Sequence, residues 1–366
     1  MTRRILQIIP TLVRGGAEKQ LSLLAAQIPS DQYETHVAVL THSGPLEEDL
    51  KTAEIPVHQI NKRWKADPLA YWKLRKLIRR LKPDIVQTWL FAANSYGRYA
   101  AIRERVPVVI GSERCVDPWK VWHELAIDRF LAKRCTKLVT NSSGVVDFYE
   151  QKGIVSDRFQ IIPNGVPIYT PSSSSRESLL EELKLPADSK LIVAIGRLWP
   201  QKRMKDLIWA ADLLKVIRPD THLLIVGDGP QRNRLEQYTN QVAIADRVQI
   251  LGSRSDTATL LQHANCLWLG SGFEGQSNAI MEAMSAAVPV FATDIPGNRD
   301  LIVDGESGIL VPVGDRAAFA SKTNVLLDNP QQATAIGQAA QQRMLEEFSV
   351  EQMIQRYVDF YDRLCE

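Results

Sequence analysis

Short apolar runs alternate with segments of helical spacing along the whole chain, and this alternation limits the possible folds more than any other feature. Among the 366 residues, thirteen apolar runs have the length of strands. The runs are 5–9, 36–40, 57–60, 85–88, 108–110, 138–140, 160–162, 191–195, 222–226, 248–251, 266–269, 290–293 and 309–311. Segments with helical spacing, for example 17–27 and 68–81, lie between most of them. Strands that alternate with helices form parallel sheets with helices on both faces, so we expect an α/β protein.

The chain is long enough for two domains of this kind. A stretch rich in proline and serine, 167–186, separates the two sets of strands, and 171–175 is its best linker candidate. We therefore place an N-terminal domain in 1–170 and a C-terminal domain in 171–347.

The end of the chain, 348–366, is predicted to form one helix. Its apolar residues recur about once per helical turn. These residues are Met353, Tyr357, Phe360 and Leu364. Two placements are open: the helix packs on the second domain, or it crosses back and braces the first.

The composition indicates a globular protein of the cytoplasm. Apolar residues make up 45% and charged residues 23% of the chain, which is ordinary for a soluble domain. No apolar run approaches the length of a membrane span. The four cysteines have no paired spacing, which favours free thiols in a reducing compartment, and no His/Cys spacing suggests zinc.

The net charge of +2 hides an asymmetry between the two halves. Residues 1–168 hold 25 Lys/Arg against 17 Asp/Glu, a balance of +8, whereas the remainder holds 19 against 25, a balance of −6. A basic half joined to an acidic half indicates that the first half meets an anionic partner. A membrane surface and a nucleic acid are both open at this point.

The segment 62–82 concentrates this positive charge. It contains nine basic residues, interleaved with Trp64, Tyr71 and Trp72, and its apolar side chains, Trp72 among them, can share one helical face. A basic amphipathic helix with aromatic residues is typical of binding to an anionic membrane surface. The alternative is an ordinary helix that packs on the sheet with a solvated basic face. Nucleic acid is not expected as a partner, because no binding module accompanies the charge.

The stretch 268–296 carries the strongest chemical signal. A short strand is followed by a loop with three glycines and then by a helix that begins near Ser277 and is stopped by Pro289. Glu274 lies in the loop, and Glu282 lies about one turn into the helix. Helical side chains lean toward the N-terminus, where backbone N–H groups attract a phosphate or a sugar hydroxyl. The stretch therefore predicts an anion-binding site beside two carboxylates, an arrangement that suits a nucleotide sugar.

A second cluster directly follows the strand 191–195. Gly196 precedes Arg197, and Lys202 comes five residues later. Ligands of open α/β sheets bind outside the carboxyl ends of the strands. Arg197 offers a planar fork of donors and Lys202 a mobile point charge, so the pair can neutralise a departing diphosphate.

A glycine pair, Gly15 and Gly16, separates the first strand from the first helix. Adjacent glycines allow a backbone to approach another group closely at a helix N-terminus. A simple tight turn is the alternative. A dinucleotide fingerprint is not supported, since no Gly-x-Gly-x-x-Gly follows the first strand.

Together these motifs resemble those of the retaining glycosyltransferases of family 4, and the likeness covers essentially the whole chain. The matching motifs are Gly196-Arg197-Leu198 with Lys202, Gly227-Asp228-Gly229-Pro230, Glu274 with Glu282-Ala283-Met284, Gly15-Gly16-Ala17-Glu18, and the hinge Ile162-Pro163-Asn164-Gly165-Val166. The resemblance implies the GT-B fold. In that fold two Rossmann-like, doubly wound domains face each other across a cleft, and the C-terminal helix crosses back to the N-terminal domain.

The resemblance also implies a set of donor-site residues. Arg197 and Lys202 would hold the donor diphosphate, and Glu274 would bind the hydroxyls of the transferred sugar; these three form the expected catalytic set. Glu282 would bind the ribose. The other implied donor-binding positions are Gly15, Gly16, Gly196, Gly275, Gln276, Ser277 and Asn278.

The implied reaction transfers a hexose-type sugar from a UDP- or GDP-sugar with retention, with no metal and no other cofactor. Retention is ascribed in this family to attack on the same face, with the leaving phosphate taking the acceptor proton. A lipid-linked glycan or another cell-envelope polysaccharide precursor is the expected acceptor. The enzyme would then be cytoplasmic and peripheral at the inner face of the membrane.

The first domain departs from the family pattern. Many relatives carry a histidine at its strand ends, where this chain has Trp89 in one stretch and Glu113-Arg114 in another. We expect Glu113, Arg114 or the nearby His123 to take that place. With the hinge residue Asn164, these positions form the expected acceptor side of the site.

Two other functions are alternatives to sugar transfer. A nucleotide-sugar epimerase of the same fold is opposed by the basic pair Arg197 and Lys202 combined with the two spaced glutamates. A non-catalytic scaffold that binds membrane or nucleic acid is opposed by the intact set of donor-site residues.

Overall fold

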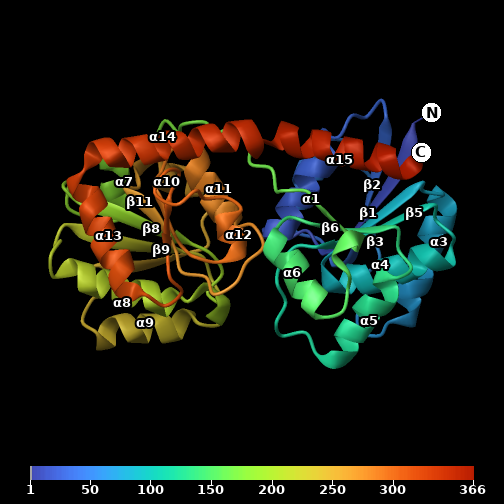
Figure 1. The fold of residues 1–366 in the computed structure, drawn as a ribbon, viewed down its shortest axis with the longest axis horizontal. Coiled ribbons are helices and arrows are strands. Elements are labelled where there is room, and N and C mark those ends of the chain that lie inside the picture. Colours follow the sequence, from blue (N-terminus) through green and yellow to red (C-terminus); the bar gives the residue numbers. More distant parts are fainter. Residues whose placement is uncertain (1) are drawn as a thin grey trace. The chain divides into compact units, whose positions relative to one another are not determined.

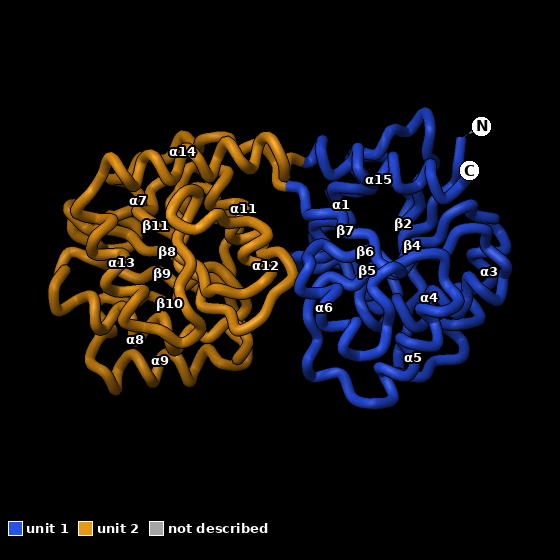
Figure 2. Tube along the Cα trace, in the orientation of Figure 1, with its two compact units in different colours: residues 1–165, 350–366 blue, residues 166–349 orange. Residues whose placement is uncertain are grey.

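The computed structural model describes residues 2–366, which form two compact units (Figures 1 and 2). Unit 1 contains the chain up to Gly165 together with Val350–Glu366, and unit 2 contains Val166–Ser349. The expected division into two α/β units is confirmed. The first crossing between the units lies at Gly165, ahead of the expected linker at 171–175.

Unit 1 is built on a seven-stranded parallel sheet with the order β3-β2-β1-β4-β5-β6-β7. The strands are β1 (Arg3–Thr11), β2 (Tyr33–His42), β3 (Val57–Gln59), β4 (Ile85–Trp89), β5 (Val108–Glu113), β6 (Lys137–Thr140) and β7 (Phe159–Ile161). Each overlaps one of the apolar runs of the first half. Such runs suit a parallel sheet because helices cover both of its faces.

Helices cover the two faces of this sheet in two groups. They are α1 (Gly16–Gln27), α2 (Leu46–Thr52), α3 (Pro68–Leu81), α4 (Leu90–Arg103), α5 (Trp122–Ala132), α6 (Ser143–Gln151), the short 3-10 helix η1 (Ser156–Arg158) and the final helix α15 (Val350–Cys365). Along β1, Ile5 and Ile9 pack in the core with α1, α2 and α15. The alternate residues Leu6 and Ile8 pack in the core with α3, α4 and α6.

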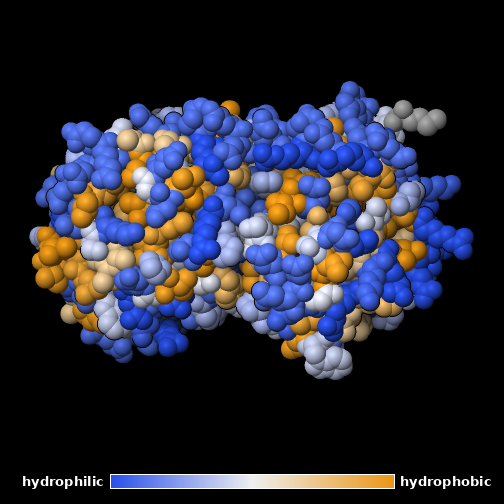
Figure 3. Space-filling view, in the orientation of Figure 1, coloured by the Kyte–Doolittle hydropathy of each residue, from blue (hydrophilic) through white to orange (hydrophobic). Residues whose placement is uncertain are grey.

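The final helix α15 belongs to unit 1, although the chain before it belongs to unit 2 (Figure 2). The Tyr33 hydroxyl donates to Asp362 at 2.7 Å, and the Gln7 amide donates to the hydroxyl of the fully buried Tyr361 at 3.2 Å. The surface over α15 in Figure 3 is hydrophilic, as an amphipathic helix requires. The expected crossing of the C-terminal helix is thus confirmed, and the alternative of packing on the second domain is wrong.

Unit 2 is built on a six-stranded parallel sheet with the order β10-β9-β8-β11-β12-β13. The strands are β8 (Lys190–Ile195), β9 (Thr221–Val226), β10 (Val248–Gly252), β11 (Cys266–Leu269), β12 (Val290–Thr293) and β13 (Ile309–Val311). All six coincide with expected runs. The order reverses between β8 and β11, and such a switch point places a crevice at the carboxyl edge of the sheet.

Helices also cover both faces of the second sheet. They are α7 (Arg176–Glu182), the 3-10 helix η2 (Pro200–Lys202), α8 (Met204–Lys215), α9 (Arg232–Gln241), α10 (Thr257–His263), α11 (Asn278–Ser285), α12 (Pro296–Arg299), α13 (Arg316–Asp328) and α14 (Pro330–Glu347). One core lies among α7, α10, α11 and α14, and the other lies among α8, α9 and α13. Across residues 2–366, no helix combines the length and the apolar character that crossing a bilayer requires.

The two crossings of the chain lie close together within each unit. In unit 2, the Val166 N–H donates to the Phe348 carbonyl at 2.8 Å. In unit 1, the amide of Gln20 exchanges two hydrogen bonds of 2.9 Å with the backbone of Gly165. A Cβ at Gly165 would lie 2.9 Å from the Val350 Cα, so only glycine fits there.

The helix α3 coincides with the helix expected within 62–82. Asp67 caps it by accepting from the Ala70 N–H at 3.0 Å. Its buried side chains are Ala70, Leu74, Leu77 and Ile78. Trp72 is 54% exposed, so the expectation that it shares the apolar face is wrong. It stands two residues from Leu74, and that spacing places it on another side of the helix.

Candidate active site

Two of the expected catalytic residues meet in unit 2, although 72 positions separate them. The loop after β8 carries Lys202, whose ammonium forms an ion pair with Glu274 in the loop after β11. The Ser271 hydroxyl donates to the same carboxylate at 2.8 Å. Gly196 leaves room for this arrangement, since a Cβ there would lie 3.2 Å from the Lys202 Cε. The pair lies outside the carboxyl ends of two adjacent strands, at the switch point of the sheet.

The loop that carries Glu274 is held from one side by the loop after β8. The Gly272 N–H donates to the Gln201 carbonyl at 2.9 Å, and the Gln201 side chain donates to the Phe273 carbonyl at 2.8 Å. These bonds fix the backbone on which Glu274 stands. Gln201 lies within the sequence motif that contains Lys202, so one short segment supplies both the cation and the support of its partner.

The same loop is held from the other side by the segment that begins at β12. The Thr293 hydroxyl donates to the Ser271 carbonyl at 2.5 Å, and the buried Asn298 donates to the Thr293 carbonyl at 2.8 Å. Gly297 is required by close contact, because a Cβ there would lie 1.9 Å from the Gly275 carbonyl oxygen. Sequence reasoning missed Ser271, Thr293 and Asn298. The signal for Ser271 was its position among the glycines, three residues before Glu274.

The helix α11 begins directly after this loop, as expected. Its N-cap is Ser277, whose side chain makes no capping bond. Gln276 and Ser277 are buried, whereas Asn278 and Glu282 are half-buried. Side chains on a helix lean toward its N-terminus, so Glu282 leans toward the glycine loop. The helix start and its two carboxylates therefore form a compact set within unit 2.

Arg197 differs from Lys202 in its surroundings. Its side chain is exposed, and its guanidinium lies 5.8 Å from the centroid of the Trp199 ring. Lys202 has only 13% of its side chain exposed. The basic pair thus consists of one fixed cation and one that extends into solvent.

In unit 1 the glycine pair forms the start of α1, as expected, but the adjoining space is filled. A Cβ at Gly15 would lie 2.2 Å from a carboxylate oxygen of Glu18. Glu18 also accepts from the Thr11 hydroxyl at 3.2 Å. A carboxylate at a helix N-terminus is favourable, and here it occupies the place expected for a phosphate beside Gly15 and Gly16.

The expected acceptor side is largely interior. Trp89 is fully buried and donates to Gln7 at 2.7 Å. Arg114 is buried, bonds Asn164 and lies 3.4 Å from the Tyr357 hydroxyl of α15. The polar groups of Trp89, Arg114 and Asn164 are thus engaged inside unit 1, and their place on the acceptor side stays a prediction.

Glu113 also belongs to the interior. Its carboxylate accepts from the Tyr149 hydroxyl at 2.9 Å and lies 3.4 Å from the Lys120 ammonium. Lys120 in turn pairs with Asp128 at 2.9 Å, and Asp128 pairs with the fully buried Arg98 at the same distance. The direct role expected for Glu113 stays a prediction, and in this structure its carboxylate is bonded within the cluster. Of the five acceptor-side candidates, only His123, at the start of α5, is exposed.

Burial changes the titration of this interior cluster. Burial raises the pKa of Asp117 to about 6, against the attraction of Lys120. Burial acts to lower the pKa of Lys120, but the carboxylates of Glu113, Asp128 and Asp117 outweigh it, so that pKa is raised. The cluster thus keeps its lysine charged and holds Asp117 near the point where it takes up a proton.

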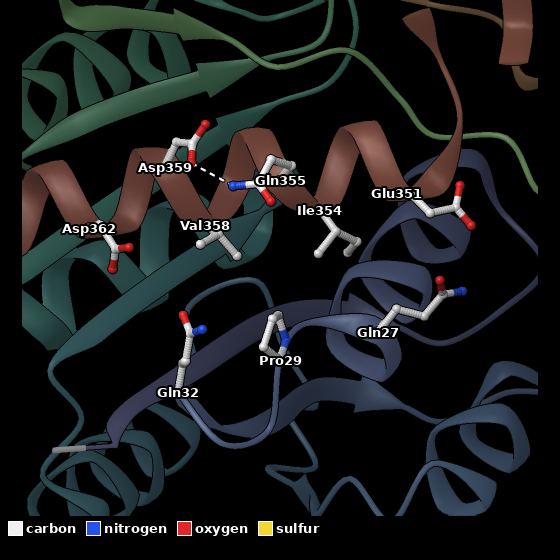
Figure 4. A pocket seen from close by; sticks show the side chains of 9 residues that line it. All are labelled: Gln27, Pro29, Gln32, Glu351, Ile354, Gln355, Val358, Asp359 and Asp362. Atoms are coloured by element: carbon white, nitrogen blue, oxygen red, sulfur yellow. Dashed lines mark hydrogen bonds between the residues drawn. The ribbon is translucent and has the colours of Figure 1, made fainter. Parts of the chain in front are cut away.

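A groove of about 440 Å³ lies elsewhere in unit 1, between α15 and the turn before β2 (Figure 4). Side chains from both elements line it: Gln27, Pro29, Gln32, Glu351, Ile354, Gln355, Val358, Asp359 and Asp362. The groove is at the amino edge of the sheet, because its residues Pro29 and Gln32 directly precede β2. Ligands of such sheets bind at the opposite edge, so the groove marks the seam where α15 docks. Across residues 2–366, no group of three or more His, Cys, Asp or Glu side chains is arranged to hold a metal ion.

Two family models match the chain. "Glycosyltransferase Family 4" matches residues 14–170, and "Glycosyl transferases group 1" matches residues 175–343. Together they span nearly all of both units.

Similar proteins match over most of their length. A UDP-Gal:alpha-D-GlcNAc-diphosphoundecaprenol alpha-1,3-galactosyltransferase of Escherichia coli is 25% identical over 97% of this chain and 95% of its own. An alpha-1,4-N-acetyl-D-galactosaminyltransferase of Campylobacter jejuni, named for a glycan acceptor on PP-undecaprenol, is 27% identical over 88% of each chain. Anabaena HepE, solved with UDP and glucose, superimposes with a TM-score of 0.89 at 22% identity, over 99% of this chain and 100% of its own. Its fold is the GT-B fold.

Proposed function

Because the chain belongs to glycosyltransferase family 4, we propose that it transfers a hexose-type sugar, with retention, from a UDP-sugar to a lipid-linked glycan. A GDP-sugar is the alternative donor. The carrying observation is the Lys202–Glu274 ion pair at the switch point of the sheet in unit 2. The Escherichia coli relative supports UDP, since its name specifies UDP-Gal as donor.

In this proposal the Lys202 ammonium donates hydrogen bonds to the Glu274 carboxylate and to the nucleotide sugar at the same time. An ammonium has three N–H donors, so one bond can stay on Glu274 while the others reach the diphosphate. Arg197, exposed in this structure, swings onto the same phosphates. Glu274 accepts from the sugar hydroxyls, and Glu282, in α11, accepts from the ribose. The backbone at Gly275 to Asn278 receives the sugar and phosphate at the helix start.

The chemistry follows from where charge develops. Departure of the nucleoside diphosphate leaves an oxocarbenium-like sugar and an anionic leaving group. Cations fixed beside that group lower the barrier, and one such preorganised donor is typically worth about 3–4 kcal/mol. The acceptor attacks from the face that the phosphate leaves, and the phosphate takes its proton. Arg197 and Lys202 supply the positive charge, so the proposal includes no metal.

The proposed acceptor places the enzyme at the cytoplasmic face of a membrane. The names of both relatives specify acceptors carried on undecaprenol through a diphosphate. In this chain, α3 buries its apolar face in unit 1 and exposes Lys73, Lys76, Arg79 and Arg80. Cations exposed in this way attract anionic lipid headgroups. We propose that α3 brings unit 1 to the surface on which the acceptor resides.

Isothermal calorimetry with UDP and GDP tests the donor assignment. We expect UDP to bind and Lys202→Ala to weaken it by about 10- to 100-fold, as the loss of a charge-assisted hydrogen bond implies. Arg197→Ala should weaken it less, because that side chain must first be ordered. Lys215→Ala is the matched control, since Lys215 pairs with Asp212 in the same unit. Unchanged affinity in both Lys202→Ala and Arg197→Ala would contradict the diphosphate assignment.

A further inference from the structure

Four exposed tryptophans gather at one edge of unit 1. Trp64, Trp72, Trp119 and Trp122 have exposed fractions of 61%, 54%, 58% and 78%. An exposed tryptophan ring keeps a large apolar area in contact with water, so four in one region of a domain require an explanation.

Their positions along the chain place all four at the carboxyl edge of the sheet. Trp64 lies in the loop between β3 and α3, and Trp72 lies in the second turn of α3. Trp119 lies in the loop after β5, and Trp122 is the first residue of α5. Each helix in such a sheet begins where the preceding strand ends. The helices α3 and α5 flank α4 on one face of the sheet, so the two pairs lie along the same end of one helix layer (Figure 1).

Basic groups are interleaved with these rings. The Lys76 ammonium lies 5.4 Å from the centroid of Trp72, and Lys62 lies 5.0 Å from the centroid of Tyr96. Arg63 and Lys65 flank Trp64. In the middle of the layer, Tyr71 of α3 stacks on Tyr99 of α4 with ring centroids 5.6 Å apart. This edge therefore combines amphipathic aromatic rings with cations, and the cations lie around the start of α3.

The other four tryptophans do not form a second group of this kind. Trp199, after β8 in unit 2, is 49% exposed and has the Arg197 guanidinium 5.8 Å from its ring centroid. Trp89 and Trp268 are fully buried, each with its ring N–H bonded inside its unit. Trp209, in unit 2, is 40% exposed and is covered by the Arg316 guanidinium 4.1 Å from its ring centroid. A group of four exposed tryptophans is thus found where α3 and α5 of unit 1 begin, whereas exposed tryptophans in unit 2 number two, Trp199 and Trp209.

We propose that Trp64, Trp72, Trp119 and Trp122 insert into the headgroup region of an anionic bilayer and hold the carboxyl edge of unit 1 against it. This inference deepens the proposed function and rests on it, since a lipid-linked acceptor must be met at that surface. Indole rings prefer the interface because one part is apolar and the N–H is polar. The adjacent lysines favour an anionic bilayer over a second copy of this basic unit, because like charges repel. The basic face of α3 attracts the membrane, and the tryptophans fix which edge faces it.

Vesicle binding by the full chain tests this inference. The probes are vesicles of phosphatidylcholine with and without phosphatidylglycerol, some containing brominated lipid that quenches inserted tryptophans. The Trp72→Ala/Trp122→Ala variant should bind anionic vesicles about tenfold more weakly and lose most of the quenching, because two interfacial anchors are removed. Trp209→Ala is the matched control and should bind like the wild type. The residual binding of the double variant should remain sensitive to salt.

Three outcomes would overturn the inference. The double variant binds and is quenched like the wild type; or neither protein binds vesicles; or sedimentation shows a wild-type dimer that the double variant turns into a monomer. The third outcome would make this edge an interface between two copies.

UDP calorimetry on the same proteins distinguishes failure of this inference from failure of the proposed donor site, because the tryptophans lie in unit 1. Loss of vesicle binding with UDP affinity intact supports the inference, whereas vesicle binding without any UDP affinity defeats only the donor assignment.

Discussion

Units 1 and 2 have the same α/β architecture but use their buried charges differently. In unit 1, Glu113 is the last residue of strand β5 and is buried in a cluster with Lys120 and Arg98. The side chains of Lys120 and Arg98 are at most 2% exposed. In unit 2, Glu274 follows β11 and pairs with Lys202, and these side chains keep 9% and 13% exposure. Both glutamates stand near the carboxyl edge of a parallel sheet. Two carboxylates at the same edge of a parallel sheet thus differ in how far their partners leave them exposed to solvent and to a ligand.

A substitution in the interior cluster of unit 1 should change the stability of the protein more than any other change considered. Lys120→Met removes the cation that faces Glu113, Asp117 and Asp128, and leaves Arg98 as the remaining cation against three carboxylates. Unpairing a buried charge typically costs 3–5 kcal/mol, so we expect a loss of about that size in the free energy of unfolding. Urea denaturation followed by circular dichroism measures it. The exposed Lys133→Met is the control, and an equally small loss in both variants would show that the cluster is not structural.

The second prediction concerns the activity of a variant at Glu274. Glu274→Ala should lower the rate of sugar transfer by about 100- to 1,000-fold, the usual range for removing one preorganised polar contact to a transition state. The variant should still fold but melt at a lower temperature, since Lys202 loses its partner, and circular dichroism at the assay temperature confirms that the folded protein is measured. Initial rates with a UDP-sugar and an acceptor, compared with the exposed Glu236→Ala, measure the effect. Full turnover in Glu274→Ala would remove this residue from the site.

The third prediction uses the titration of Asp117. Its folded pKa of about 6 lies above its ordinary value, so the stability it contributes is present at low pH and is lost as the pH rises through about 6. Asp117→Asn removes that loss. We expect the difference in unfolding free energy, variant minus wild type, to rise between about pH 4 and pH 7 by at most about 3 kcal/mol. A flat or falling difference across this window would contradict the assignment of a raised pKa.

The smallest effect sharpens the description of the donor loop. Ser271→Ala removes one hydrogen bond to Glu274 and leaves the Lys202 pair in place. We expect kcat/KM to fall by a factor that corresponds to about 1 kcal/mol of transition-state stabilisation, as for a single neutral hydrogen bond. Ser271→Thr should restore most of it. An effect as large as that of Glu274→Ala would show that Ser271 contacts the substrate directly.

The sequence predicts the fold and the donor loop well for a local reason. Every strand of both sheets is an apolar run, and a parallel sheet buries such runs on both faces. The segments that carry Lys202 and Glu274 each follow a predicted strand, and the carboxyl ends of parallel strands meet at one edge. The resemblance to family 4 assigns both residues to the donor, and the structure adds that β8 and β11 are neighbouring strands.

The burial of the acceptor-side candidates could not be predicted, because burial of a polar group depends on partners distant in the sequence. Glu113 resembles a site residue until Arg98 and Lys120 are seen around it. The Arg114 guanidinium donates hydrogen bonds to Asn164 and to Tyr357, which lies on the last helix. The exposure of Trp72 has a simpler reason. The sequence pattern places this tryptophan on the apolar face, but its helical position sets it apart from Leu74 and Ile78.

Hydrogen exchange of the whole chain, with and without UDP, tests most directly the claim that unit 2 grips the donor through its two loops. The account predicts that UDP slows exchange in the loop 196–203 and in 270–282, and that the start of α11 is protected most. Protection confined to unit 1, or none in either loop at saturating UDP, would contradict it.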